Sequence, residues 1–291
     1  DEDDEQFSIT LSSLTNVDAG TLVGVGTITD NDAAPSLSIS DASTAEGGKL
    51  SFTITLSAAS EKTVTVTAAS ADGSATAADN DYTALASTIV TFAPGETSKV
   101  VEVQTSDDGK YEGNEDILLN LSLAANATIA DAQGVGTITD EADKPSLSIA
   151  DAVSVNEGGD LSFRVSLSNL ATSPVTVFAK TADGSATSAD NDYTSLGLTK
   201  LTIPALASFV DVVIHTTGDA TFESDEDLFV QLSSPSSNAS IAADKAKGII
   251  LNDDAKPKVS IDNQTIVEGG SLTFNVTLTN PSSQAISAAY S

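Results

Sequence analysis

The feature that most constrains this chain is an internal repeat. Glu-Gly-Gly stands at positions 46–48, 157–159 and 268–270, with 111 residues from each copy to the next. Other segments recur once at nearly the same spacing: Pro-Ser-Leu-Ser-Ile at 35–39 and 145–149, Ala-Asp-Gly-Ser-Ala-Thr at 71–76 and 182–187, and Gly-Val-Gly-Thr-Ile-Thr-Asp at 24–30 and 134–140. Similarity at a long fixed period indicates an array of like units.

This period divides the chain into four segments. We expect complete repeats at 35–143 and 144–256, the C-terminal strands of a truncated repeat at 1–34, and the N-terminal strands of another at 257–291. We therefore expect the chain to be a window from a longer tandem array. The first partners of each repeat would then be its neighbours in the same chain.

Within each repeat, apolar and polar residues alternate with the period of two that is typical of half-buried β-strands. Leu50, Phe52 and Ile54 show this alternation, and clusters of Gly, Asp, Asn and Pro separate the runs. In the first complete repeat we expect strands near 36–40, 49–57, 62–70, 86–92, 98–106, 115–123 and 133–139. The pattern predicts an all-β chain of tandem immunoglobulin-like seven-stranded antiparallel sandwiches arranged end to end. Phe52, Tyr82 and Phe92 are the expected aromatic core of the first.

Composition removes several functional classes. The chain has 42 Asp and Glu against 12 Lys and Arg, a net charge of −30. Too few cations are present to neutralise phosphates, which excludes nucleic acid as a partner and disfavours anionic membrane surfaces. No Cys is present, so disulfides, thiol chemistry and cysteine-bound zinc are excluded, and with the single His215 we expect no enzyme. No apolar run approaches the roughly 20 residues of a membrane-spanning helix, so we expect no membrane insertion of this segment.

The acidic residues gather at the turns between the expected strands. Counting strands places three acidic stretches at one end of the first sandwich: the turn after the third strand, the turn after the fifth, and the segment after the seventh. Two carboxylates ~4 Å apart repel by about 1 kcal/mol in water and about 4 kcal/mol at an effective dielectric of ~20. Hard oxygen ligands in flexible loops favour Ca²⁺ over Mg²⁺ as the neutralising cation. The alternative is a solvated acidic surface of halophile type that holds no specific ion.

Each complete repeat resembles a Calx-β domain. The resemblance rests on Glu-Gly after the first strand, Asp-Gly-Ser-Ala-Thr through Asp-Tyr, Pro94-Gly95-Glu96, the acidic run from Asp107 to Asp116, and Ile138-Thr139-Asp140. It implies Ca²⁺ ligands in the first repeat at Glu46, Asp81, Asp107, Asp108, the backbone carbonyl of Lys110, Glu112, Glu115 and Asp140, with Glu141 or Asp143 completing the shell. In the second repeat it implies Glu157, Asp192, Asp219, Glu223, Glu226 and Asp253, with Asp254 as a further candidate.

The second repeat departs from this pattern at two positions. Gly218 replaces the first Asp of the pair at 107–108, and Asn252 stands where Asp140 would be. We therefore expect fewer ions, or weaker binding, in the second repeat.

These observations favour a non-catalytic, Ca²⁺-loaded module that spaces and stiffens a large extracellular or cell-surface protein, such as a bacterial adhesin. The main alternative is an adhesion module in which Ca²⁺ supports loops that bind a glycan or protein ligand. An intracellular Ca²⁺ sensor of the exchanger kind is a third hypothesis.

Overall fold

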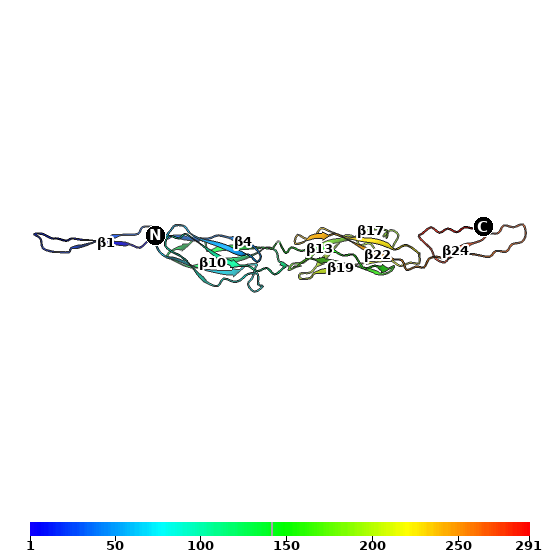
Figure 1. Ribbon diagram of the computed structural model, residues 1–291, viewed down its shortest axis with the longest axis horizontal. Helices are drawn as coiled ribbons and strands as arrows, with labels where there is room; N and C mark the ends of the chain where they lie inside the picture. The colour runs from blue at the N-terminus through cyan, green and yellow to red at the C-terminus, as the bar shows by residue number, and fades with distance from the viewer. Residues whose placement is uncertain (141) are drawn as a thin grey trace. The chain divides into compact units, whose positions relative to one another are not determined.

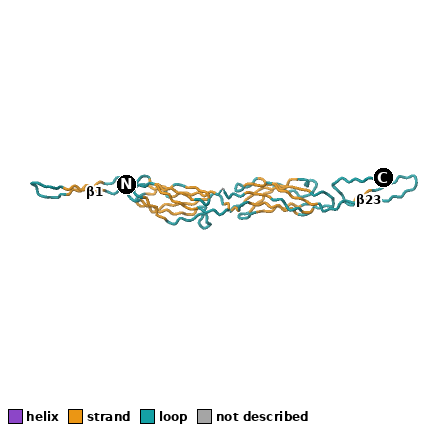
Figure 2. Tube along the Cα trace, viewed as in Figure 1, coloured by secondary structure: helices purple, strands orange, loops and turns teal. Residues whose placement is uncertain are grey.

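The computed structural model describes residues 1–140 and 142–291, so Glu141, one of the expected ligands, lies outside the described residues. By its contacts the chain forms two compact units, residues 1–108 with 112–142 and residues 109–111 with 143–291. The described residues form strands and loops without a helix (Figure 2), and none of them forms a helix of the length and apolarity that a membrane crossing requires.

The first unit contains a sandwich of two sheets (Figure 1). One sheet has the strand order β4 (Ala42–Ala45), β12 (Gln133–Thr139), β10 (Glu115–Ala125), β6 (Val64–Asp72) and β7 (Thr88–Phe92). The other has the order β11 (Thr128–Ile129), β3 (Ser36–Ile39), β5 (Lys49–Leu56) and β8 (Ser98–Gln104). A ribbon of β1 (Glu5–Thr10) and β2 (Val23–Ile28) precedes the sandwich.

The second unit repeats this architecture. Its first sheet has the order β14 (Val155–Asn156), β22 (Lys245–Leu251), β20 (Glu226–Ser233), β17 (Val175–Asp183) and β18 (Thr199–Ile203). Its second has the order β19 (Phe209–His215), β15 (Asp160–Leu167), β13 (Ser146–Ile149) and β21 (Ser240–Ala243). Two short pairs complete the unit: β9 (Lys110–Tyr111) with β16 (Leu170–Ala171), and β23 (Val259–Ile261) with β24 (Val276–Leu278).

The core follows from the alternation in the sequence. Leu50, Phe52 and Ile54 of β5 are completely buried, while the residues between them face outward or lie at intermediate exposure. Phe92 is also completely buried and Tyr82 is 3% exposed, as predicted. Full burial of one such side chain stabilises the fold by roughly 1.5–3 kcal/mol. The two sheets are therefore held together by the apolar face of each strand.

The all-β sandwich and its seven main strands are confirmed, but the first strand is divided. The chain leaves β3 in one sheet and continues as β4 in the other, where β4 runs parallel to β12. Asp41 lies at this crossing, and its Oδ1 accepts a hydrogen bond from the Val135 N–H at 2.8 Å. Ala42–Ala45 contains no large apolar residue, so alternation gave no signal for this strand.

Candidate metal centre

The Glu-Gly-Gly turn places one acidic side chain at the end of each sandwich. Gly47 has a φ of +71°, a conformation that glycine adopts without steric cost. The Glu46 N–H donates to the carbonyl of Thr139 at 3.2 Å, so the turn is attached to the end of β12. In the second repeat the Glu157 N–H donates in the same way to Leu251 at 3.1 Å. The spacing of 111 residues therefore reproduces the same local structure.

A second loop, between β6 and β7, places Asp81. Its Oδ2 accepts a hydrogen bond from the Thr76 N–H at 2.7 Å, and its backbone carbonyl accepts one from Ser106 at 2.8 Å. The next residue, Tyr82, donates its hydroxyl to Asp72 Oδ1 at 2.7 Å. Asp72 is thus an anchor of this loop, in agreement with the turn-forming role that its position before a glycine indicates. The tyrosine contact was not predicted.

The loop between β8 and β10 meets the segment that follows β12 at Asp140. This side chain is 2% exposed. Its Oδ2 accepts hydrogen bonds from the N–H groups of Glu112 and Gly113, the second at 3.0 Å. A buried carboxylate that accepts backbone N–H bonds holds the loop in place, and here it fixes the segment that carries Glu112.

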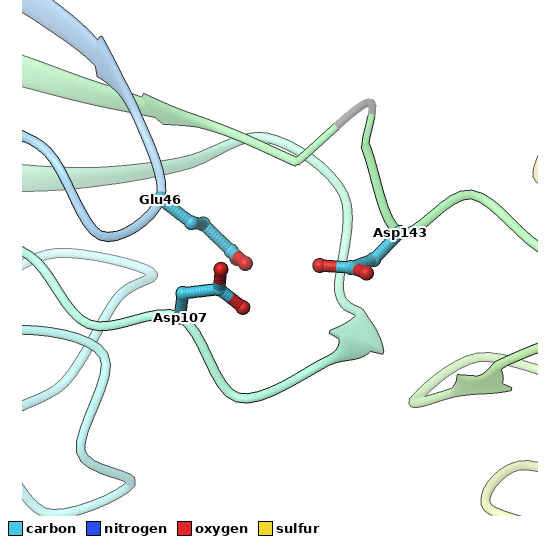
Figure 3. A group of neighbouring side chains, drawn as sticks. All are labelled: Glu46, Asp107 and Asp143. Atoms are coloured by element: carbon cyan, nitrogen blue, oxygen red, sulfur yellow. The ribbon is translucent and has the colours of Figure 1, made fainter.

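Carboxylate oxygens from separate loops come together in the first unit. Oxygens of Asp81, Glu112 and Glu115 lie within 4.8 Å of one another, and so do oxygens of Glu46 and Asp107. Figure 3 shows the side chains of Glu46 and Asp107 turned toward one another from different loops. A small cavity beside them is lined by polar and acidic residues and one isoleucine: Glu46, Asn80, Asp81, Ser106, Asp108, Glu112, Glu115 and Ile138.

One carboxyl group of this cluster, that of Glu115, has a strongly raised pKa. Burial is the main cause that raises the pKa of Glu115 to about 7, and the charges of Asp81, Glu112, Asp140 and Asp79 contribute to this rise. Carboxylates that are close together and partly desolvated disfavour their own ionisation. The cluster therefore favours a proton, or another cation, at neutral pH.

The second repeat builds the same arrangement from its own residues. Oxygens of Asp192, Glu223 and Glu226 lie within 4.8 Å of one another, and oxygens of Glu157, Asp219 and Asp254 form another such group. The small cavity between them is lined by Glu157, Asn191, Asp192, Thr217, Asp219, Glu223, Ser224, Glu226 and Ile250.

Three glutamates of this second cluster have a raised pKa. Burial raises the pKa of Glu226 to about 7, with the charges of Asp192 and Glu223 acting in the same direction. Burial raises the pKa of Glu157 to about 6, and the charges of Asp254 and Asp219 contribute. The pKa of Glu223 is raised as well, chiefly by burial.

Two substitutions distinguish the second cluster from the first. Asn252 accepts a hydrogen bond from the Glu223 N–H at 2.9 Å through Oδ1, and its Nδ2 donates to the carbonyl of Asp254 at 3.0 Å. Asp219 joins Glu157, while its neighbour Gly218 has no side chain to contribute. The loop geometry is kept, and the negative charge is lower.

Three further predicted residues are Lys110, Asp143 and Asp253. Lys110 is in β9, which pairs with β16. Asp143 begins the main segment of the second unit, where its backbone carbonyl and Oδ1 each accept a hydrogen bond from Asn169 Nδ2 at 3.1 Å. Asp253 is exposed, and its charge contributes to the raised pKa of Glu157.

Sequence reasoning missed the asparagine that precedes Asp81 and Asp192. Asn80 and Asn191 line the two cavities, and both have a positive φ, +78° and +71°. The signal was available in the repeated Asp-Asn-Asp-Tyr segment. An amide carries no charge, so a pattern of acidic residues does not include it.

The donor atoms suit a hard divalent cation. They are carboxylate oxygens on several loops, which is the ligand type that Ca²⁺ and Mg²⁺ take. In the second cluster, Oδ2 of Asp254 is buried and has no hydrogen-bond partner among the described residues. A buried oxygen of this kind is costly without a partner, and a cation would supply one. The residues present therefore fit a metal ion.

The fold and the acidic groups together define a class: tandem β-sandwich modules with an oxygen-rich centre at one end of each complete repeat. A family model described as the Calx-beta domain matches residues 30–143 and again residues 140–255. These matches span most of the chain, which therefore belongs to the Calx-beta domain family, and the resemblance drawn from the motifs is confirmed.

Several solved structures are similar to parts of this chain. The crystal structure of CBD12 from CALX1.2 is 14% identical, with a TM-score of 0.36, and the match covers 74% of this chain and 98% of that chain. The crystal structure of calcium binding domain CBD12 of CALX1.1 is also 14% identical, with a TM-score of 0.37, covering 74% of this chain and 99% of that one. The crystal structure of the apo form of the Calx CBD1 domain is 25% identical, with a TM-score of 0.34, covering 38% of this chain and 98% of that one. No curated protein sequence matches the chain.

Proposed function

We propose that this chain is a non-catalytic Ca²⁺-binding module whose tandem repeats space and stiffen a large extracellular or cell-surface protein, an adhesin of bacterial type. The observation that carries the proposal is the meeting of carboxylate oxygens from separate loops within 4.8 Å in each complete repeat. Membership of the Calx-beta family, matched once over each complete repeat, supports it.

The proposed ligands are the side chains that the loops bring together. In the first repeat they are Glu46, Asp81, Asp107, Asp108, Glu112, Glu115 and Asp140. In the second they are Glu157, Asp192, Asp219, Glu223, Glu226 and Asp254. Lys110, Asp143 and Asp253 stay candidates from the family resemblance. Of the two common hard cations, Ca²⁺ is favoured because it takes six to eight oxygens in flexible geometry, whereas Mg²⁺ retains its waters.

The residues themselves explain how a cation would act. Ionised carboxylates on separate loops repel one another. Burial, together with this repulsion, raises the pKa of Glu115 and of Glu226 to about 7. A bound Ca²⁺ supplies positive charge that offsets the repulsion. Because the loops lie next to the connection to the following repeat, ordering them would restrict that connection. A ligand that binds only the ordered state stabilises it by mass action.

The proposed extracellular setting agrees with the chemistry of loop-built sites. Extracellular Ca²⁺ modules bind in the 10⁻⁴–10⁻³ M range, which matches the Ca²⁺ available outside cells. Absence of Cys leaves the fold with no disulfide to stabilise it. Cations would then take the place of covalent cross-links.

The test is calorimetry and small-angle scattering of the chain in Ca²⁺ and after excess chelator. We expect Ca²⁺ to raise the melting temperature and to narrow the distribution of inter-repeat distances, and Mg²⁺ at equal concentration to do so less. An unchanged melting temperature and an unchanged maximum dimension would reject the proposal. A change in melting temperature alone would keep Ca²⁺ binding and reject the stiffening role.

A further inference from the structure

One backbone contact beside the carboxylate clusters recurs with the period of the repeat. In the second unit the Phe222 N–H donates to the carbonyl of Pro281 at 3.0 Å, and the Ser283 N–H donates to the carbonyl of Phe222 at 3.2 Å. Phe222 and Ser282 form a parallel β-bridge. Phe222 belongs to the complete repeat at 144–256, and Ser282 belongs to the segment that follows it.

The same pairing occurs 111 residues earlier in the sequence. Tyr111 of β9 pairs in parallel with Ala171 of β16, and the Thr172 N–H donates to the carbonyl of Tyr111 at 3.0 Å. The first unit holds a third case, in which the Glu61 N–H donates to the carbonyl of Asp1 at 3.1 Å. A backbone pairing that returns at equivalent positions is a property of the repeat.

Side chains strengthen the contact around Phe222. Gln284 Nε2 donates to Ser224 Oγ at 2.9 Å, and the ammonium of Lys256 lies 5.8 Å from the centre of the Phe222 ring, within the range of a cation–π attraction. Two side-chain contacts therefore accompany the backbone bridge, one from the segment 281–284 and one from the end of the repeat at 144–256.

The chemical groups that form the bridge determine whether it needs a cation. Its donors and acceptors are backbone N–H and C=O groups, with an amide and a hydroxyl beside them. These groups are neutral, so the pairing requires no cation to overcome charge repulsion. Addition of one strand to the edge of another is a recognised way in which protein surfaces bind each other.

We infer that residues 222–224 are a docking strand for the repeat that follows, that its partner is the segment 281–284, and that this contact forms without metal. Tyr111 and Asp1 hold the equivalent place in the other two cases. Inside a unit, the complete repeat and the truncated repeat are then joined at two points, by the covalent linker and by the docked strand. Two attachments restrict a hinge more than one does, because the second contact forms at a high effective concentration.

Cross-linking in the full chain tests this inference. The chain has no Cys, so Ser224→Cys with Gln284→Cys introduces the only two thiols, at side chains that touch. A matched control pairs Ser224→Cys with Ser271→Cys, which precedes β24, whereas the docking segment follows that strand. With a short bifunctional maleimide in excess chelator, we expect the first pair to cross-link about tenfold faster than the control, because docking raises the effective concentration.

A second pair of variants isolates the backbone bond. Ser283→Pro removes the N–H that donates to Phe222, whereas Ser283→Ala keeps that N–H and removes only the hydroxyl. Added to the cysteine pair, Ser283→Pro should lower the cross-linking rate to that of the control, and Ser283→Ala should leave it high. Equal rates for the two cysteine pairs, or fast cross-linking only in Ca²⁺, would overturn the inference. Calorimetric titration of the same chain with Ca²⁺ tests the proposed function separately.

Discussion

The two carboxylate clusters differ in charge while their loops keep one equivalent hydrogen bond, from the N–H of Glu112 or Glu223 to the side chain at position 140 or 252. In the first repeat, Asp140 accepts the N–H groups of Glu112 and Gly113. In the second, Asn252 accepts the N–H of Glu223 with a neutral oxygen. The loop position therefore depends on an acceptor atom, and the charge of the centre is a separate property that the repeat can vary.

The second difference concerns which aspartate faces the glutamate of the Glu-Gly-Gly turn. Asp107 meets Glu46 in the first repeat, and Asp219 meets Glu157 in the second, although Asp219 is equivalent to Asp108 by its spacing. Because Gly218 has no carboxylate, its neighbour Asp219 meets Glu157 in the way that Asp107 meets Glu46. We therefore expect the second centre to bind a cation with lower affinity, and four predictions test this comparison.

The largest effect is expected from Asp107→Ala with Asp108→Ala. The pair removes two carboxylates from the first centre, so the first repeat should lose its Ca²⁺-dependent stabilisation while the second keeps its own. Saturation at 100 times Kd stabilises by about 2.7 kcal/mol, equivalent to a rise of about 10 °C or more in Tm for a domain of this size. Calorimetry with and without Ca²⁺ measures the loss.

A matched control keeps the charge change and moves it away from the centre. Glu61→Ala with Glu102→Ala removes two carboxylates from the surface of the same repeat, and Glu102 is exposed and paired with Lys49. The Ca²⁺ effect should survive in this control. Equal losses in both variants would mean that net charge, and not a site, governs the response.

Exchanging Asp140 of the first centre and Asn252 of the second should exchange the Ca²⁺ affinities of the two centres. Asn252→Asp adds a carboxylate to the second centre and should tighten Ca²⁺ binding by about tenfold, or about 1.4 kcal/mol. Asp140→Asn should weaken the first centre by a similar factor, since the amide oxygen still accepts the N–H groups of Glu112 and Gly113. Titration calorimetry gives both constants, and unchanged affinities would refute the role of these two positions.

The metal-free chain should lose stability as pH rises. The pKa of Glu115 and that of Glu226 are raised from 4.5 to about 7 in the folded chain. Folded protein then binds more protons than unfolded protein between these values, so the stabilising contribution is complete below about pH 4.5 and is lost as pH rises through about 7. The contribution of Glu157, with a pKa raised to about 6, should already be lost at about pH 6 in the second repeat.

Thermal unfolding in chelator at pH 5 and pH 8 measures this effect. Glu115→Gln should flatten the pH dependence of the first repeat only, and Glu226→Gln that of the second only. Higher stability at pH 8 than at pH 5 would contradict the assignment. With Ca²⁺ the dependence should reverse, because protons then compete with the cation.

The smallest effect, and an equal one in both repeats, is expected from Tyr82→Phe and Tyr193→Phe. Each tyrosine donates its hydroxyl to an aspartate before a glycine, Asp72 or Asp183. Loss of one such bond costs about 1 kcal/mol, which unfolding in denaturant resolves. Both values should be independent of Ca²⁺, and a Ca²⁺-dependent difference would show that this anchor belongs to the centre.

Much of the fold could be read from residues that act locally. The recurrence of Glu-Gly-Gly gave the repeats, and alternation in segments such as Leu50–Leu56 gave the strands and the core, because side chains on a strand point to opposite faces in turn. Strand parity placed the acidic turns at one end. The family motifs then supplied residue-by-residue expectations for the ligands.

Other features could not be read in this way. The parallel strand β4, the hydroxyl bond from Tyr82 to Asp72, and the pairing of Phe222 with Ser282 carry no local signal. Each joins segments whose separation depends on how loops fold and how the strands are staggered.

The sequence by itself thus determined that this is a tandem β-sandwich protein with acidic turns, since periodicity and charge are properties of neighbouring residues. Tertiary structure decided which carboxylates meet: Asp81 with Glu112 and Glu115, and Glu46 with Asp107. It also decided that Asp140 is buried. The physical reason is that electrostatic repulsion and ligand geometry act over a few ångströms, and residues far apart in the chain come that close only through packing of the two sheets.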